Sequence, residues 1–165
     1  MSMTGNKYRT TEQLQEIVQQ AKAGGQTVVF TNGAFDLLHV GHIRYLHGAA
    51  AIGDIVICAL NSDESIRALK GPGRPVMPLE ERIEIVGALE SIDYVTSFSE
   101  TTVTRLLLAL KPDIHAKGTD YTEDSVPEVE TVRSYGGRVA ITGDPKDHNT
   151  SDIIAGIQLD QDKSN

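Results

Sequence analysis

The sequence predicts an α/β protein with a Rossmann-like, doubly wound parallel sheet of five strands in a single domain. Short apolar segments alternate with amphipathic segments along the chain, as expected when helices cover both faces of a parallel sheet. The polar clusters directly follow the apolar segments, where such folds bind their ligands. The 165 residues suffice for one domain with a sizeable core.

The strands are predicted from short runs rich in branched apolar residues. The second run, from Asp54 to Leu60, is continuously apolar after its first residue, which is typical of a strand buried on both faces of a parallel sheet. The five expected strands span residues 27–30, 54–60, 92–98, 113–116 and 138–141.

The helices are predicted from apolar residues that recur at helical spacing and from glycine or proline at their ends. Thr10 or Thr11 is a plausible cap of the first helix, and Pro112 ends the fourth. The expected helices cover residues 13–23, 43–52, 78–90, 101–110, 126–135 and a last helix that opens over 147–154. We expect residues 1–9 and the polar tail over 160–165 to be flexible.

Composition excludes several classes of protein. A net charge of −8 argues against a nucleic-acid-binding surface, but it leaves room for an anionic nucleotide in a local positive pocket. Cys58 is the single cysteine, so no internal disulfide can form, and its apolar surroundings favour a buried thiol over a nucleophile. Because neither a signal peptide nor a long apolar span is visible, we expect a cytoplasmic protein without a membrane partner.

The central feature is the stretch over residues 31–42, TNGAFDLLHVGH, between the first strand and the following helix. His39 and His42 are three residues apart, so they share one face at the start of that helix. A helix N-terminus suits a phosphate, and Gly33 and Gly41 permit close approach of backbone or ligand. The stretch therefore indicates phosphate chemistry. Taken alone, two histidines could also be a surface or core pair, or metal ligands.

Further polar clusters follow the second strand. Asn61 to Asp63 are expected beside the stretch over residues 31–42, which we call the histidine turn. Ser62 or Asp63 could also act as a plain helix cap. Lys70 and Arg74 lie in a Gly/Pro-rich stretch over residues 68–75 that could close over phosphates or form a solvated loop.

The next predicted helix, over residues 78–90, carries a cation near its N-terminus, where the helix dipole disfavours positive charge. This cation is Arg82, in the first turn. This position indicates either a ligand or a carboxylate partner, for which Glu81 and Asp36 are the candidates.

Two more clusters lie late in the chain. Lys117 to Tyr121 follow the fourth strand, at the same sheet edge as the histidines. Asn149, Thr150 and Ser151 open the last helix. They form a capping signature and a second helix N-terminus that could hold phosphate.

The pattern Gly33-x-Phe35-Asp36-x-x-His39-x-Gly41-His42 resembles the nucleotidyltransferase signature of the cytidylyltransferase-like superfamily. Within it, the chain is most similar to adenylyltransferases that act on D-glycero-D-manno-heptose 1-phosphate. In many bacteria that activity is one domain of a bifunctional protein with a sugar kinase; no kinase domain fits in 165 residues, so the resemblance implies a stand-alone transferase. The similar segments are residues 29–33, 61–63, 69–71, 74–76, 78–82, 87–90 and 117–121.

The chain departs from this family at two places. Asn149-Thr150-Ser151 replaces a Ser-Thr-Thr run at the start of the last helix, and its hydroxyls are partly kept. Thr119 stands where a second glycine is more usual, in a loop that faces the sugar in the family.

The resemblance implies transfer of AMP from ATP to a heptose 1-phosphate, which gives ADP-heptose and pyrophosphate for a surface glycan of the lipopolysaccharide type. It also implies a Mg²⁺ ion held mainly by substrate phosphates, no protein metal ligands, and a homodimer. The expected catalytic residues are His39, His42 and Lys70. The expected ligand-binding residues are Thr31, Asn32, Gly33, Phe35, Gly41, Asn61, Asp63, Arg74, Arg82, Lys117, Gly118, Asp120, Tyr121, Thr150 and Ser151.

Three alternatives remain open from the sequence. A cytidylyltransferase acting on glycerol 3-phosphate or another sugar or polyol phosphate would share the signature. A nucleotide-binding module without catalysis would be favoured by loss of a histidine, and both histidines are present. A metal-dependent hydrolase would need a third ligand besides His39 and His42, and none stands at a fixed spacing.

Overall fold

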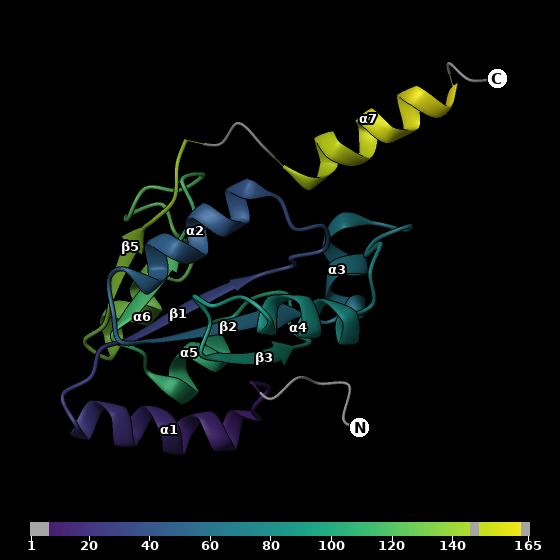
Figure 1. The fold of residues 1–165 in the computed structure, drawn as a ribbon. Coiled ribbons are helices and arrows are strands. Elements are labelled where there is room, and N and C mark those ends of the chain that lie inside the picture. Colours follow the sequence, from purple (N-terminus) through teal and green to yellow (C-terminus); the bar gives the residue numbers. More distant parts are fainter. Residues whose placement is uncertain (1–6, 146–148, 163–165) are drawn as a thin grey trace.

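The computed structural model describes residues 7–145 and 149–162. Five parallel strands form one sheet in the order β3-β2-β1-β4-β5 (Figure 1). The predicted five-stranded, doubly wound fold is therefore confirmed. The strands are β1 Val28–Gly33, β2 Ile55–Asn61, β3 Tyr94–Phe98, β4 Ile114–Lys117 and β5 Arg138–Ile141.

Seven helices connect or flank the strands in the described residues. Their bounds are α1 Thr11–Ala23, α2 Val40–Ala50, α3 Asp63–Lys70, α4 Leu79–Gly87, α5 Thr104–Leu110, α6 Val129–Ser134 and α7 Thr150–Asp162. Helix α3 was foreseen only as a possible cap, and Ser62 indeed accepts a hydrogen bond from the Ser65 amide. It extends to Lys70, so Lys70 ends a helix instead of lying in a loop.

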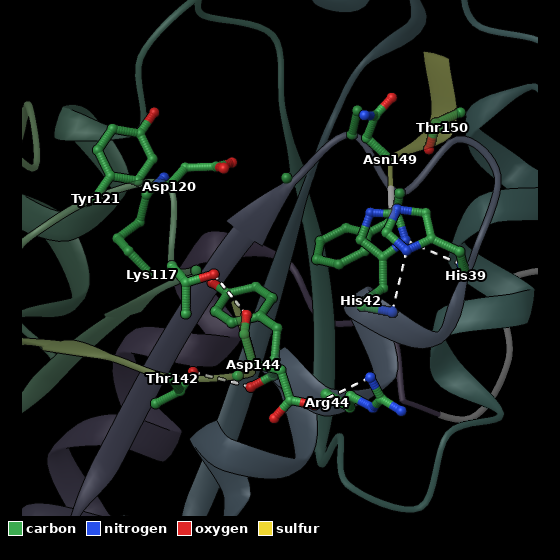
Figure 2. Close-up of a pocket in the computed structure, with 18 of the residues that line it drawn as sticks. His39, His42, Arg44, Lys117, Asp120, Tyr121, Thr142, Asp144, Asn149 and Thr150 are labelled. Carbon is green, nitrogen blue, oxygen red and sulfur yellow. Dashed lines mark hydrogen bonds and ion pairs between the residues drawn. The ribbon is translucent and has the colours of Figure 1, made fainter. Parts of the chain in front are cut away.

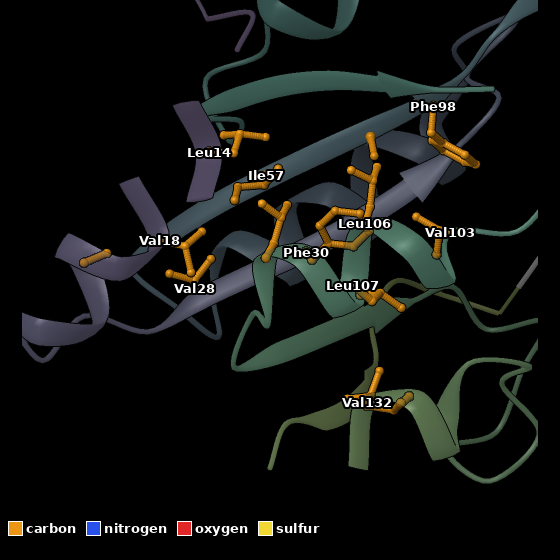
Figure 3. Close-up of a cluster of buried hydrophobic side chains, with 14 of the residues drawn as sticks. Leu14, Val18, Val28, Phe30, Ile57, Phe98, Val103, Leu106, Leu107 and Val132 are labelled. Carbon is orange, nitrogen blue, oxygen red and sulfur yellow. The ribbon is translucent and has the colours of Figure 1, made fainter. Parts of the chain in front are cut away.

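Two apolar cores lie on the two faces of the sheet. Val28 and Phe30 of β1 face α1 and α5, where Leu14 and Leu107 are fully buried (Figure 3). Between them, Val29 faces the opposite core with residues of α2 and α4. This alternation follows from the two-residue repeat of a strand, and it explains why the central strands are continuously apolar.

The two terminal segments for which flexibility is predicted contain regular structure in the described residues. The prediction of a flexible segment over residues 1–9 did not include the bridge that Tyr8 makes with Val95 of β3. Helix α7 projects away from the sheet (Figure 1) and continues through Asp162, beyond the expected start of the polar tail. The predictions for residues 1–6, 147–148 and 163–165 lie outside the described residues.

Two compositional predictions can be compared with the structure. Cys58 is fully buried, and burial raises the pKa of its thiol to about 12, so it is protonated and unreactive at neutral pH. No helix within the described residues is long and apolar enough to cross a membrane.

Candidate active site

A cavity of about 370 Å³ opens at the carboxyl ends of β1 and β4. From β1 the chain proceeds to β2 on one side, whereas β4 lies on the other side. The sheet order therefore reverses between β1 and β4, which is where open α/β sheets bind ligands. The lining residues come from the histidine turn, α2, the end of α3, the β4 loop, the β5 loop and the start of α7.

The structure brings most of the predicted site residues together. Those that line the cavity are Asn32, Gly33, Phe35, His39, Gly41, His42, Lys70, Lys117, Gly118, Asp120, Tyr121, Thr150 and Ser151. Thr31, Asn61, Asp63, Arg74 and Arg82 do not line it.

The two histidines are arranged by the first turn of α2. His39 is the N-cap, and its Nδ1 accepts from the Gly41 amide at 3.1 Å. The His42 Nδ1 accepts from the His39 amide at 3.3 Å. The rings stack with centroids 3.8 Å apart. Because an accepting Nδ1 carries no proton, each ring has its proton on Nε2. The turn thus sets both rings as Nε2–H donors beside a helix N-terminus.

Phe35 closes the turn in an unusual backbone conformation. Its backbone φ angle is +48°, in the left-handed region that residues other than glycine rarely adopt. The conformation is held by packing, since Phe35 is 3% exposed and its ring lies 5.2 Å from that of His42. Gly33 allows this packing, because a Cβ there would lie 3.0 Å from the Phe35 ring.

Asp36 organises the loop after α3 instead of facing the cavity. Its carboxylate accepts from the amides of Val76 and Met77 and from Arg74 Nε, each at 2.9 Å. Burial raises the pKa of this carboxyl, but the two amides and Arg74 outweigh burial and hold the pKa below its ordinary value of 3.8. Asp36, one of the two candidate partners of Arg82, does not pair with it: the cation of Asp36 is Arg74, which this ion pair holds beside the turn.

We expect Asp36→Asn to destabilise the protein by about 2–3 kcal/mol at pH 7, because an amide cannot accept all three charge-assisted bonds. Since the folded pKa is lowered, this contribution is fully present above pH 3.8 and is lost as the pH falls through the lowered value. Urea unfolding at several pH values measures the difference. Asp124→Asn, which removes an exposed ion pair with Arg133, is the control and should change little.

Arg82 is a buried structural cation. It is fully buried, and its guanidinium donates to the carbonyl oxygens of Met77, Ala34 and Asn61. Its carboxylate partner is Asp63, at 2.7 Å, and not Glu81 or Asp36. The guanidinium therefore joins α4, the end of β2 and the histidine turn behind the cavity. A direct contact of Asn61, Asp63 or Arg82 with a ligand has no support in this arrangement.

Thr31 is also directed into the protein. Its side chain is fully buried, and its hydroxyl donates to the Ile57 carbonyl of β2 at 3.2 Å.

The other side of the cavity carries the residues after β4. Figure 2 shows Lys117, Asp120 and Tyr121 across the cavity from His39, His42 and Thr150. Burial lowers the pKa of the Lys117 ammonium, and the carboxylates of Glu128 and Asp120 partly counter this effect. The Lys117 ammonium lies 5.0 Å from the centre of the Tyr121 ring. This side thus combines a cation with hydroxyl and carboxylate groups, a set that suits a phosphorylated, hydroxyl-rich ligand.

The start of α7 reaches back to the histidine turn. The Thr150 hydroxyl donates to the Leu37 carbonyl at 3.1 Å, and the Asn149 side chain accepts from the Asp152 amide as a cap. The predicted capping signature is therefore present, and it borders the cavity together with Ser151.

Several cavity residues were not predicted from the sequence. Tyr45 donates its hydroxyl to the Ala116 carbonyl of β4 at 2.6 Å, and Arg44 pairs with Asp144 at 3.0 Å. Both come from α2, and only Tyr45, three residues after His42, could have been placed on the face of the histidines from helical spacing. The remaining unpredicted lining residues are Thr142, Gly143, Asp144 and Pro145, whereas Ala34, Thr119 and Asn149 belong to clusters that are predicted from the sequence.

Within the described ranges, no group of three or more His, Cys, Asp or Glu side chains is placed to hold a metal ion. Of the carboxylates that the structure describes, Asp120 and Asp144 line the cavity. Asp144 is in the ion pair with Arg44 and Asp120 lies by Lys117. Such a donor set fits an ion that takes most of its oxygen ligands from a bound phosphate and from water.

A parallel sheet with phosphate-suited donors at the point where its strand order reverses, between β1 and β4, defines a phosphate-binding α/β protein. The cytidylyltransferase-like family model matches residues 30–156, so the chain belongs to this family of nucleotidyltransferases. It is 47% identical over 152 residues to the bifunctional protein HldE of Syntrophotalea carbinolica, and 44% identical over 160 residues to that of Salmonella arizonae. These alignments cover 92% and 97% of this chain but 31% and 34% of the relatives. The chain thus spans about a third of their length.

Solved structures of other proteins share the fold, among them the two that follow. A lipopolysaccharide core biosynthesis protein from Thermoplasma volcanium superposes with a TM-score of 0.63 at 23% identity, over 74% of this chain and 100% of that one. Pantoate-beta-alanine ligase from Francisella tularensis gives 0.59 at 17% identity, over 88% of this chain and 69% of that one. At these identities the likeness establishes the fold alone.

Proposed function

We propose that the protein transfers AMP from ATP to a heptose 1-phosphate, giving ADP-heptose and pyrophosphate. The observation that carries the proposal is the pair of Nε2–H donors, His39 and His42, at the α2 N-terminus on the cavity. The choice of acceptor is supported by the resemblance outside the signature and by the identity of 44–48% to HldE proteins.

In the proposed reaction, an oxygen of the sugar 1-phosphate attacks the α-phosphorus of the nucleotide in line. A new P–O bond forms, the bond from the α-phosphorus to the bridging oxygen breaks, and pyrophosphate leaves with the electron pair. Because the attacking phosphate is already an anion, catalysis needs alignment and charge neutralisation more than a strong base. His39 and His42 donate hydrogen bonds to phosphate oxygens as negative charge moves to the leaving group.

The other groups would bind and orient the two substrates. Lys70, at the end of α3, neutralises phosphate charge at the cavity. Thr150 and Ser151 stand at the start of α7, where the backbone amides and the Ser151 hydroxyl would add donors for a phosphate, while the Thr150 hydroxyl donates to the Leu37 carbonyl and holds this start beside the cavity. Lys117, Asp120 and Tyr121 are assigned to the sugar phosphate, because they lie across the cavity from the histidines (Figure 2). Gly33 and Phe35 shape the nucleotide side.

We further propose that Mg²⁺ accompanies the nucleotide. The ion would supply charge neutralisation at the phosphates, with its ligands mainly from substrate and water. We also propose a homodimer in the cytoplasm, whose product serves a surface glycan. These three statements rest on the family resemblance.

Pyrophosphate release tests the proposal. The purified protein would be incubated with Mg²⁺ and ATP, CTP, GTP or UTP against heptose 1-phosphates of both anomers, glycerol 3-phosphate and other sugar phosphates. Release with ATP and a heptose 1-phosphate is the expected result. Release with CTP and glycerol 3-phosphate would keep nucleotidyl transfer and replace the acceptor. No pyrophosphate release with any pair of substrates would contradict the proposed activity.

A further inference from the structure

A histidine that the proposed reaction does not use lies directly behind the cavity. His115 is in β4, next to β1, and is fully buried. Its Nε2 is 3.0 Å from Oδ1 of Asn32, a cavity residue at the end of β1. The Phe30 ring packs edge-on against the imidazole, with centroids 5.8 Å apart. The imidazole therefore contacts the site through one side chain, that of Asn32.

The direction of this hydrogen bond follows from a second neighbour. The Lys117 ammonium lies 3.5 Å from the same Asn32 atom. An ammonium can only donate, so this atom is the carbonyl oxygen of the amide and not its nitrogen. His115 Nε2 must then donate as well. The imidazole is the Nε2–H tautomer, and its buried Nδ1 has no hydrogen-bond partner in the described structure.

The ring is kept in this form by its surroundings. Burial, and to a lesser extent the Lys117 ammonium, lower the pKa of His115 to about 3. Phe30 and Asn32 contact the ring, Val139 of β5 pairs beside it, and the Lys117 ammonium acts on it electrostatically. His115 is therefore neutral at physiological pH and acts as a permanent single donor, in contrast to a histidine that exchanges protons during turnover.

We propose that His115, acting through Asn32, is a positioning residue for the transfer reaction. With two donors on its carbonyl oxygen, the Asn32 side chain turns its amide nitrogen to the cavity. That nitrogen and the Lys117 ammonium then form two neighbouring donors for one anionic oxygen group, which we assign to the phosphate of the acceptor. The assignment to the acceptor rests on the proposed function, whereas the orientation of Asn32 does not.

Without the His115 donor, the Asn32 amide could rotate and present its oxygen to the phosphate. An oxygen facing an anion repels it, so the loss of this donor should weaken phosphate binding more than it lowers the stability of the fold. Glutamine at position 115 retains an amide donor, whereas leucine retains bulk without any donor. This pair of variants separates the hydrogen bond from packing.

The kinetic test uses His115→Leu, His115→Gln, Asn32→Ala and the double variant His115→Leu/Asn32→Ala. We expect His115→Leu to raise the acceptor KM about tenfold, the effect of one hydrogen bond to a charged group, with the nucleotide KM unchanged. His115→Gln should restore most of the loss. In the Asn32→Ala background, His115→Leu should have no further effect. An equal loss in both backgrounds, or no rescue by glutamine, would overturn the proposal.

A second test needs no turnover. Nitrogen NMR of the full chain should show His115 as the Nε2–H tautomer without titration from pH 5 to 8. On addition of inorganic phosphate, the side-chain amide of Asn32, assigned by its absence in Asn32→Ala, should shift in the wild type and several-fold less in His115→Leu. An Nδ1–H tautomer or equal shifts would refute the inference. If these signals behave as expected but no substrate pair reacts, the proposed activity is wrong and the orientation of Asn32 stands.

Discussion

Replacing His42 with alanine is expected to lower kcat for nucleotidyl transfer by about 100-fold or more, the typical effect of losing one preorganised donor to a transition state. The His42 ring is set by the hydrogen bond from the His39 amide to its Nδ1, so that Nε2–H is the donor. Because this donor is proposed to strengthen as charge moves to pyrophosphate, the loss should appear mainly in kcat. The measurement is steady-state pyrophosphate release with saturating substrates.

The matched control is His47→Ala in the same helix. His47 is exposed in the last turn of α2, away from the cavity lining, and its loss should leave kcat unchanged. Since His42 also packs against Phe35, thermal unfolding of both variants must accompany the kinetics. A folded His42→Ala protein with near wild-type kcat would contradict the proposed catalytic role of His42.

The largest effect on stability is expected for Arg82→Met, a loss of about 3–5 kcal/mol, the range found when a buried charged pair is broken. Methionine fills much of the arginine volume but leaves the carbonyl oxygens of Met77, Ala34 and Asn61 without their donor. Each buried orphaned acceptor is costly. Asp63 adds less, because its side chain is 36% exposed and can be hydrated. Urea unfolding measures the free-energy difference.

Arg82→Lys tests the geometry of the guanidinium. A lysine keeps the charge but lacks the planar fork that reaches several acceptors at once, so most of the loss should remain. Arg67→Met, at an exposed position of α3, is the control for removing an arginine and should have little effect. A loss below about 1 kcal/mol for Arg82→Met would mean that the three carbonyls find other donors, since one net hydrogen bond alone contributes about that much.

The fold and the histidine turn could be predicted because their signals are local. Apolar periodicity gives the strands and helices, and the spacing of His39 and His42 places both on the first turn of a helix. The position of Asn61 and Asp63 could not be inferred in the same way. The predicted polar clusters all follow strands and so lie at the carboxyl edge of the sheet. The order of the strands in the sheet decides which of these clusters lie next to one another. Because β2 lies on the far side of β1 from β4, its cluster supports the turn from behind instead of lining the cavity.

Pairing choices were also beyond the sequence. Both Arg74 and Arg82 were credible ligands for phosphate, and a carboxylate partner for Arg82 was expected. The structure pairs Arg74 with Asp36 and Arg82 with Asp63, and this outcome depends on where the chain returns after α3. His115 carried no local signal either. It reads as one residue of a short strand, and only the register of β4 against β1 brings it to Asn32.

The ion pairs of Arg74 with Asp36 and of Arg82 with Asp63 belong to a set of contacts that orders the histidine turn without a ligand. Asp36 is held by the amides of Val76 and Met77, and Ala34 is held by Arg82, so the backbone on both sides of Phe35 is fixed before any ligand arrives. The conformational entropy of ordering this turn is therefore lost during folding and not during association. In the proposed reaction, an entering phosphate would meet donors already in place, and its binding free energy would remain available for aligning the reacting groups.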